Sequence, residues 1–307
     1  MKRIASILLA AFFCLGVPKA VACTSFAVYS PKPLFGMNWD YPDTGAYLRL
    51  YQPDEYHQVF SFAFETEYGM GTNGSMNDQG LIAFVQDLHP REENTAAVGD
   101  TSVEDMHDYA SFVPYVFNNA QDVQKDLSGK HIVNKYHTIH DLIADANGNA
   151  FVLEEAGDKN ILTQAEDGVI VMTNFPNCQI GQFDMDKSET SLYYSYGFVG
   201  VDRYKAVHEV ISGHRECFDV AHAFEALEKA AQAGLYRTRY SAVYDPMKMV
   251  VYVALERDYD HIWKISMKEE TVETYLGFEK KQLRFSFAEL CEGDLGIPFE
   301  RLIAYAN

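Results

Sequence analysis

Hydrophobic and polar residues alternate through much of the chain before residue 90, with the period of half-buried β-strands. Residues 23–30 and 34–41 alternate on either side of a turn rich in proline, so the pattern predicts a β-hairpin. Two more strands are expected over 56–65 and 80–88, the second after the turn signal Asn-Asp-Gln-Gly. The first part of the chain is therefore predicted to be mostly sheet.

The period changes to that of helices after residue 110 and then returns to that of strands. Residues 111–129 carry helical spacing, as two short helices, and residues 137–156 predict a second hairpin folded about a turn. The later predictions are a strand over 168–174, helices over 202–211 and 218–232, and strands over 238–246, 249–257 and 261–267.

The order of the predicted elements is strands, helices, strands, helices, strands. It lacks regular βαβ alternation, which argues against a doubly wound parallel sheet. The long β-rich runs favour an α+β fold in which stacked sheets carry helices on their outer faces. No internal repeat, low-complexity tract or linker divides the chain, so residues 23–307 are predicted to form a single domain.

The first 22 residues have the pattern of a secretory signal peptide. Two basic residues precede an apolar run over 4–17, and Ala20-x-Ala22 offers the small residues of a cleavage site. The run is too short to span a bilayer comfortably and no later stretch comes close to it, so no stable membrane span is expected. We expect an exported protein, periplasmic or secreted, that begins at Cys23 after processing.

The formal net charge of −19 indicates an acidic surface, which repels phosphate backbones and excludes nucleic-acid partners. Four cysteines remain when Cys14 of the leader is set aside, which is too few over this length for a disulfide framework. Their spacing is not that of a zinc finger. Export would permit a disulfide among Cys178, Cys217 and Cys291, and the sequence does not choose a pair.

A cysteine at a new N-terminus carries a thiol and a free α-amino group on one residue. An α-amine has an unperturbed pKa of about 7.7–8.0, so it can accept the thiol proton and later pass it to a leaving amine. This arrangement suits acyl transfer from amides through a thioester. Two other interpretations stay open: Cys23 is an incidental first residue, or it is the acylated cysteine of a lipoprotein. Ala20 stands where lipoprotein leaders usually carry a large aliphatic residue.

Such a nucleophile needs a carboxylate near the amine and donors near the developing oxyanion. Asp40 lies at the far end of the hairpin that begins at Cys23, so antiparallel pairing can bring it beside the amine. Asn174 closes an apolar strand, where its amide could donate to an oxyanion, and Arg203 lies near a helix start, where it could favour a thiolate. The ordinary alternatives are an exposed turn acid, a turn amide and a surface arginine paired with a nearby acid.

Eight segments, in order, resemble the choloylglycine hydrolase family of N-terminal nucleophile hydrolases, which includes conjugated bile acid hydrolases and penicillin V acylases. They span the chain from Cys23 to about Met267: CTSF, FGMNWD, GSMNDQGL, FVPYVFNNAQDVQKDL, HTIHDLIADANGNAFVLEEA, GVIVMTNFPN, GVDRYKAV and TRYSAVYDPMKMVVYVALE. Singly each motif is weak, but the ordered set is specific. The resemblance implies an αββα sandwich of two antiparallel sheets and hydrolysis of a linear, non-peptide N-acyl amide.

The resemblance also implies roles for five residues. Cys23 would be the nucleophile with its α-amine as base, Asp40 would hold that amine, and Asn174 would donate to the oxyanion. Arg203 would lie near the nucleophile, and a backbone N–H on or near Asp87 would be the second oxyanion donor. No metal or organic cofactor is implied, the partner would be a small N-acyl amide substrate, and homo-oligomerisation is left open.

One residue departs from the family pattern. Met37, in Gly36-Met37-Asn38-Trp39-Asp40, replaces an arginine that family members carry close to the nucleophile. A thioether cannot stabilise a thiolate or hold a substrate carboxylate as a guanidinium does, which puts bile-salt and penicillin substrates in doubt. The departure argues for a divergent branch. An acyltransferase on the same fold and a non-catalytic, lipid-anchored binding protein are the alternatives that the sequence leaves open.

Overall fold

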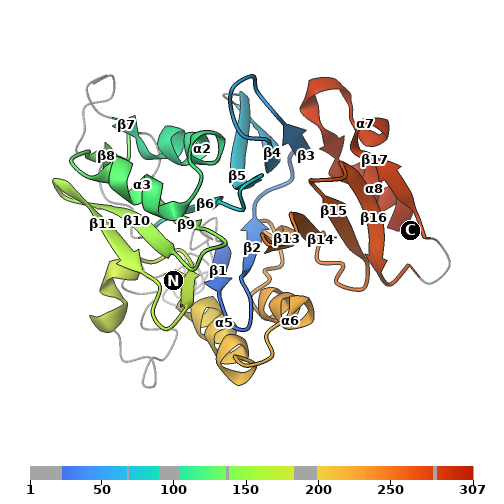
Figure 1. Ribbon diagram of the computed structural model, residues 1–307. Helices are drawn as coiled ribbons and strands as arrows, with labels where there is room; N and C mark the ends of the chain where they lie inside the picture. The colour runs from blue at the N-terminus through green and yellow to red at the C-terminus, as the bar shows by residue number, and fades with distance from the viewer. Residues whose placement is uncertain are drawn as a thin grey trace, which may run out of the picture.

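The computed structural model describes residues 23–67, 69–89, 104–135, 138–182, 199–278 and 282–306. The predicted leader, residues 1–22, lies outside these ranges. Within them, two eight-stranded antiparallel sheets pack against each other and helices cover their outer surfaces (Figure 1). This αββα sandwich confirms the fold class expected from the sequence.

The first sheet is built around the predicted N-terminal hairpin. Its strands run in the order β12 (Val169–Met172), β1 (Thr24–Val28), β2 (Leu34–Asp40), β13 (Thr238–Asp245), β14 (Val250–Leu255), β15 (Ile262–Ser266), β16 (Thr271–Leu276) and β17 (Arg284–Ser286). Every residue of β2 is buried, because one face of the strand meets the other sheet and the opposite face meets a helix. Gly36 allows a close approach there, since a Cβ at this position would come within 2.2 Å of the Phe26 ring.

The second sheet contains the other predicted hairpin. Its order is β11 (Lys159–Gln164), β10 (Ala150–Ala156), β9 (Ile139–Ala144), β6 (Ile82–Asp87), β5 (Gly69–Asn77), β4 (Val59–Thr66), β3 (Ala46–Tyr51) and β18 (Ile297–Pro298). Asp145 fixes the turn between β9 and β10, because its carboxylate accepts the backbone N–H groups of Asn147 and Asn149. The same carboxylate accepts the N–H of Ala120 at the start of a helix, which ties the hairpin to the outer layer.

The outer layers are formed by two pairs of helices. The helices α2 (Met106–Val116) and α3 (Ala120–Leu127) cover the second sheet, and α5 (Val201–Gly213) and α6 (Val220–Lys229) cover the first. The side chains of Asp105, Asn119 and Asp219 cap the N-termini of α2, α3 and α6. The remaining short elements are the parallel pair β7 (Glu104–Asp105) and β8 (Ile132–Val133), the 3-10 helices η1 (Asn177–Gln182) and η2 (Gly293–Leu295), and the C-terminal helices α7 (Phe287–Leu290) and α8 (Phe299–Ala306).

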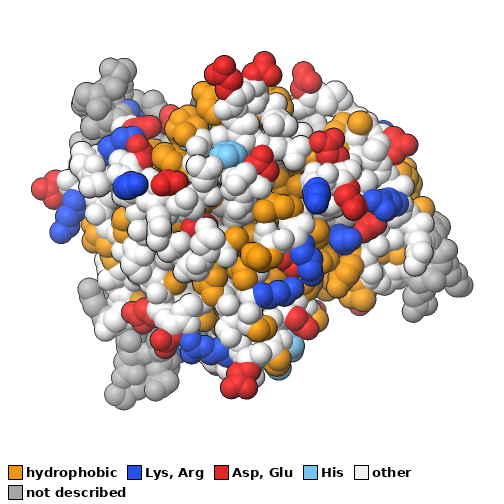
Figure 2. All heavy atoms as spheres, in the orientation of Figure 1, with side chains coloured by type: hydrophobic (Ala, Val, Ile, Leu, Met, Phe, Trp, Pro, Cys, Tyr) orange, Lys and Arg blue, Asp and Glu red, His pale blue; other side chains and the backbone are white. Residues whose placement is uncertain are grey.

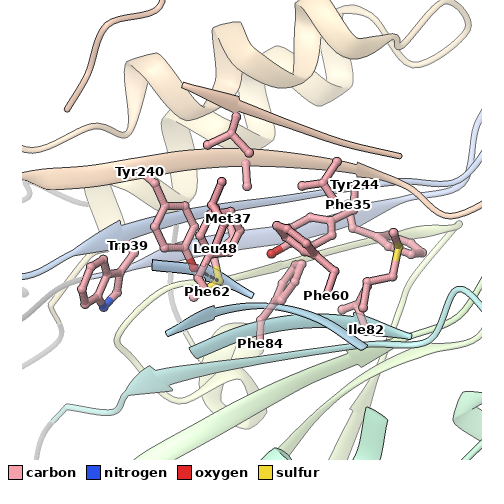
Figure 3. Packing of buried hydrophobic residues seen from close by; sticks show 14 of the residues in the cluster. Phe35, Met37, Trp39, Leu48, Phe60, Phe62, Ile82, Phe84, Tyr240 and Tyr244 are labelled. Carbon is pink, nitrogen blue, oxygen red and sulfur yellow. Dashed lines mark hydrogen bonds between the residues drawn. The ribbon is translucent and has the colours of Figure 1, made fainter. Parts of the chain in front are cut away.

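The largest hydrophobic core lies between the two sheets (Figure 3). Aromatic side chains from both sheets fill it, and the rings of Phe62 and Tyr240 stack with their centroids 3.7 Å apart. On the molecular face seen in Figure 2, acidic side chains stand out along the upper edge, and acidic and basic side chains are interspersed over the rest of the face. None of the helices in the described ranges combines the length and apolarity that a bilayer crossing requires. Cys23, Cys217 and Cys291 are free thiols.

Candidate active site

Cys23 lies immediately before β1, at the position where the first sheet faces the inter-sheet core. Its side chain is 3% exposed and belongs to that core, whereas the next residue, Thr24, turns its hydroxyl toward α5, where it meets Arg203. Burial raises the pKa of the Cys23 thiol far above its usual range, and the charges of Asp40 and Asp87 act in the same direction. A hydrogen bond from the backbone of Asp40 and the charge of Arg203 oppose this shift. In the full chain Cys23 is therefore a neutral thiol.

Asp40 ends β2 beside Cys23, as antiparallel pairing of β1 with β2 requires. Its carboxylate is completely buried and accepts hydrogen bonds from the Thr238 hydroxyl and from Nε2 of Gln232 at 2.8 Å. Burial raises the pKa of Asp40 to about 7, against the lowering effects of Arg203, Thr238 and Gln232. Asp40 thus contacts Cys23 through its backbone, while two side chains from the α6–β13 region hold its carboxylate.

Asn174 is the centre of the polar contacts around Cys23. It follows β12, and its side-chain oxygen Oδ1 accepts the backbone N–H of Cys23 at 3.0 Å. Its Nδ2 donates to the backbone carbonyl of Asp87 at 2.6 Å, and its own carbonyl accepts the N–H of His89. Because an amide nitrogen carries two hydrogens, one donor direction of Nδ2 is not used by the Asp87 contact.

Arg203 lies in the first turn of α5 and points inward, with only 6% of the residue exposed. Its Nη1 donates to the Cys23 carbonyl and to Oγ1 of Thr24, and its Nη2 donates to Oδ1 of Asn174 at 2.7 Å. The planar guanidinium is suited to join several acceptors at once, which an ammonium group is not. Arg203 therefore fixes both Cys23 and Asn174 and is no surface residue.

Gly200 makes room for this arginine. It precedes α5 with φ of 94°, in the left-handed region that favours glycine. A Cβ at this position would lie 2.5 Å from Nη2 of Arg203 and 2.9 Å from Oγ1 of Thr173. The helix start and the arginine can therefore approach the end of β12 only with glycine at residue 200.

Asp87 ends β6 on the opposite sheet and reaches the site through its main chain. Its carbonyl accepts from Asn174, and its carboxylate is close enough to Cys23 to raise the pKa of the thiol. The proposed donor role of its backbone N–H remains a prediction. The structure thus brings the five residues named from the sequence together, at the ends of β1, β2, β6 and β12 and the start of α5.

A buried His–Glu pair supports the loop that carries Asn174. Nε2 of His140 lies 2.6 Å from the carbonyl oxygen of Thr173, and Nδ1 lies 3.2 Å from Oε1 of Glu154. Glu154 also accepts the backbone N–H groups of Asn177 and Cys178, at 2.7 and 2.8 Å. Burial alone would raise the pKa of Glu154, but the His140 ring and these two donors outweigh it and lower the pKa.

The sequence did not single out this pair as part of the site. The signal that could have found it is the position of each residue, because His140 and Glu154 are polar residues within strands that are mostly apolar. A polar side chain in such a strand needs a buried partner. The same applies to Thr238 in β13, which holds Asp40 together with Gln232 from the connection after α6.

Met37 is completely buried between the sheets (Figure 3). It is paired with Ser25 on β1 and Ala242 on β13, and the Tyr240 hydroxyl lies 3.5 Å from its sulfur. The position where family members carry an arginine thus forms part of an apolar, aromatic core here. The stacked rings of Trp39 and Tyr41, with centroids 5.0 Å apart, extend this core toward the surface.

One group of potential metal ligands occurs in the described part of the chain: His214, Cys217 and His222, around the α5–α6 connection. None of these three contacts the residues around Cys23. The candidate active site itself offers a thiol, a main-chain nitrogen, one buried carboxylate, an amide and a guanidinium. This set suits nucleophilic attack on a carbonyl and stabilisation of the resulting oxyanion.

Neither a known family profile nor a curated protein matches the sequence. Solved structures do match the fold. A mutant of the conjugated bile acid hydrolase from Clostridium perfringens superposes with a TM-score of 0.60 at 17% identity, over 82% of this chain and 96% of that one. Penicillin V acylase from Agrobacterium tumefaciens superposes with a TM-score of 0.59 at 16% identity, over 82% and 90% of the two chains. The chain therefore shares the fold of these two enzymes, the αββα sandwich that the sequence resemblance implied.

Proposed function

We propose that this protein is an exported amidase that uses Cys23 as an N-terminal nucleophile to hydrolyse a linear, non-peptide amide of an N-acyl compound. The observation that carries the proposal is the convergence of Asn174 and Arg203 on the main chain of Cys23, immediately before the first strand of this fold. The fold neighbours named above are amide hydrolases, which supports the same reaction class.

Processing after Ala22 supplies the base. In the full chain the Cys23 nitrogen is a peptide amide with a single hydrogen, which donates to Asn174. Cleavage converts it into an α-amine, which accepts the thiol proton directly or through a water molecule.

The reaction then proceeds through a thioester. The thiolate adds to the substrate carbonyl, and the unused hydrogen of Asn174 Nδ2 and a main-chain N–H at Asp87 donate to the oxyanion. The ammonium of Cys23 gives its proton to the leaving amine as the carbon–nitrogen bond breaks. Water, deprotonated by the same amine, then adds to the thioester and releases the acid and the free thiol. Asp40 stabilises the ammonium form of the Cys23 amine between these steps.

Met37 defines the substrate class more narrowly. Met37, Trp39 and Tyr240 share the buried core of Cys23, so with a thioether where an arginine would stand they would form a wall without a cation. Such a wall favours an apolar acyl group over one that needs a charged partner for a carboxylate. We therefore expect N-acyl amides with uncharged acyl groups to be better substrates than bile conjugates or penicillin V.

A hydrolysis panel on the processed protein tests the function. The panel contains bile conjugates, penicillin V, N-acyl homoserine lactones, N-acyl amino acids and fatty-acid ethanolamides, each with and without an added amine acceptor. We expect release of the free acid from at least one member and its loss in Cys23→Ala and Cys23→Ser. Transfer to the added amine in preference to water would instead indicate an acyltransferase. A diacylglyceryl group on Cys23, detected by mass spectrometry of the mature N-terminus, would exclude the enzyme.

A further inference from the structure

A His–Cys–His group lies where α5 passes into α6. His214 ends α5, Cys217 stands in the connection, and His222 belongs to the first turn of α6. One ligating atom of each residue lies within 4.8 Å of the corresponding atoms of the other two. Tetrahedral zinc, with Zn–S of about 2.3 Å and Zn–N of about 2.0–2.1 Å, places its ligand atoms about 3.5 Å apart. Closing the group around an ion therefore needs side-chain shifts of only about 1 Å.

The local fold already holds these three side chains on one side of the connection. The N–H of Cys217 donates to the carbonyl of His214 at 2.9 Å, which turns the chain back over the end of α5. Asp219 caps α6 by accepting the N–H of His222 at 3.0 Å. Phe218 is completely buried and meets the Phe26 ring edge-on at 6.0 Å, which fixes the connection to the first sheet.

Each histidine of the group also has a carboxylate beside one ring nitrogen. Oδ1 of Asp219 lies 2.8 Å from Nδ1 of His222, and Oε2 of Glu225 lies 3.9 Å from Nε2 of His214. In metal sites a carboxylate at one ring nitrogen orients the imidazole and makes the other nitrogen a better ligand. The two rings lie near each other with centroids 4.0 Å apart, and Cys217 is exposed, so the side chains have room to turn toward a shared ion.

We propose that His214, Cys217 and His222 bind one Zn²⁺ ion, with a water molecule in the fourth position and Asp219 and Glu225 as outer carboxylates. Thiolate and imidazole form a ligand set that suits zinc, and on binding the Cys217 thiol releases its proton to solvent. The bound ion joins the end of α5 to the start of α6. These helices hold the candidate active site, because Arg203 lies on α5 and Gln232, which contacts Asp40, follows α6.

The direct test is zinc binding by the full protein, purified without a histidine tag and stripped with a chelator. Titration with Zn²⁺ against a chromophoric chelator should show one equivalent bound. Cys217→Ser and His222→Ala should weaken binding by at least about tenfold, whereas the matched controls Cys291→Ser and His208→Ala should not. A Cys23→Ala variant should keep the site, which separates it from the nucleophile. Failure to bind zinc, or equal affinity in wild type and Cys217→Ser, would overturn the proposal.

Two further measurements keep the result free of folding artefacts. Asp219→Asn retains an oxygen that can cap α6 but removes the carboxylate charge, and it should weaken zinc binding by about tenfold. Zn²⁺ in excess should raise the melting temperature of the wild type but not of Cys217→Ser, since only the form that binds the ion is stabilised. A melting temperature that rises equally in both would show that zinc binds elsewhere.

Discussion

Nη2 of Arg203 donates to Oδ1 of Asn174 at 2.7 Å, and the same oxygen accepts the backbone N–H of Cys23 at 3.0 Å. The guanidinium and the amide are thus held to Cys23 as one unit. Arg203→Lys keeps the charge, but a lysine cannot donate to all three acceptors of Arg203, which are the Cys23 carbonyl, the Thr24 hydroxyl and Oδ1 of Asn174. We expect kcat/KM to fall by about 10²–10³-fold and the free energy of unfolding by about 2–3 kcal/mol. Arg215→Lys, at an exposed position beyond the same helix, is the control and should change neither quantity.

Gly200 is predicted to be indispensable for the same contact. Gly200→Ala places a Cβ 2.5 Å from Nη2 of Arg203 and forces φ of 94° on a residue that disfavours it. We expect a loss of about 1–3 kcal/mol in urea unfolding, together with lower activity. Gly213→Ala, at the other end of α5, meets no atom within 4 Å of its Cβ and should be neutral or stabilising. Equal effects of the two substitutions would contradict this role for Gly200.

The His140–Glu154 pair should act on the reaction through the position of Asn174. His140→Gln and Glu154→Gln each leave buried polar groups without a partner, which should cost about 2–3 kcal/mol of stability. Because the two residues act through one chain of contacts, the double variant should lose less stability than the two single variants lose together. The expected coupling energy is about 1–3 kcal/mol. A positioning role predicts a fall in kcat with KM little changed. Additive losses in a double-mutant cycle would show that the pair is not a unit.

Asp40 should make the full chain less stable as the pH rises. Its pKa is about 7 in the folded state and about 3.9 in an unfolded chain. Between these values the folded state binds a proton that the unfolded state has released, so the free energy of unfolding falls with increasing pH. From about pH 5 to about pH 8 the loss from this group is roughly 3 kcal/mol.

The matched variant for this effect is Asp40→Asn, which cannot titrate and can still bond Thr238 and Gln232 if the Gln232 amide turns over. Urea unfolding at the two pH values should show a steeper pH dependence for the wild type than for Asp40→Asn. If both proteins change equally, Asp40 is already ionised when folded.

The elements that the sequence predicted are those with a clear period. The two hairpins, β1–β2 and β9–β10, and the strands β13 to β15 have regular alternation or β-branched runs and were found near their expected bounds. The strand β5 was missed because its sequence, GMGTNGSMN, contains three glycines and little β propensity. Pairing with β4 and β6 on its two sides holds it in the sheet, and that support is not visible in a local window.

In the candidate site, the sequence could likewise identify some residues but not the contacts between them. Asp40, Asn174 and Arg203 could be named because each stands in a motif of the ordered set. Their contacts could not, since Gln232 and Thr238 reach Asp40 from 192 and 198 residues away along the chain. The Cys23 nitrogen donates to Asn174 and not to Asp40, which the resemblance implied as its partner. This contact depends on the tertiary arrangement and on the peptide bond that still joins Cys23 to Ala22.

We propose that cleavage before Cys23 creates the active enzyme. Two forms of the protein, one beginning at Cys23 and one retaining Ala22 before it, can be made by site-specific proteolysis of fusions and their N-termini verified by mass spectrometry. Assayed on the substrate found in the hydrolysis panel, the first form should be active and the second should be at least about 10³-fold slower, because its nucleophile has no α-amine. Equal rates for the two forms would show that hydrolysis does not need a free α-amine on Cys23.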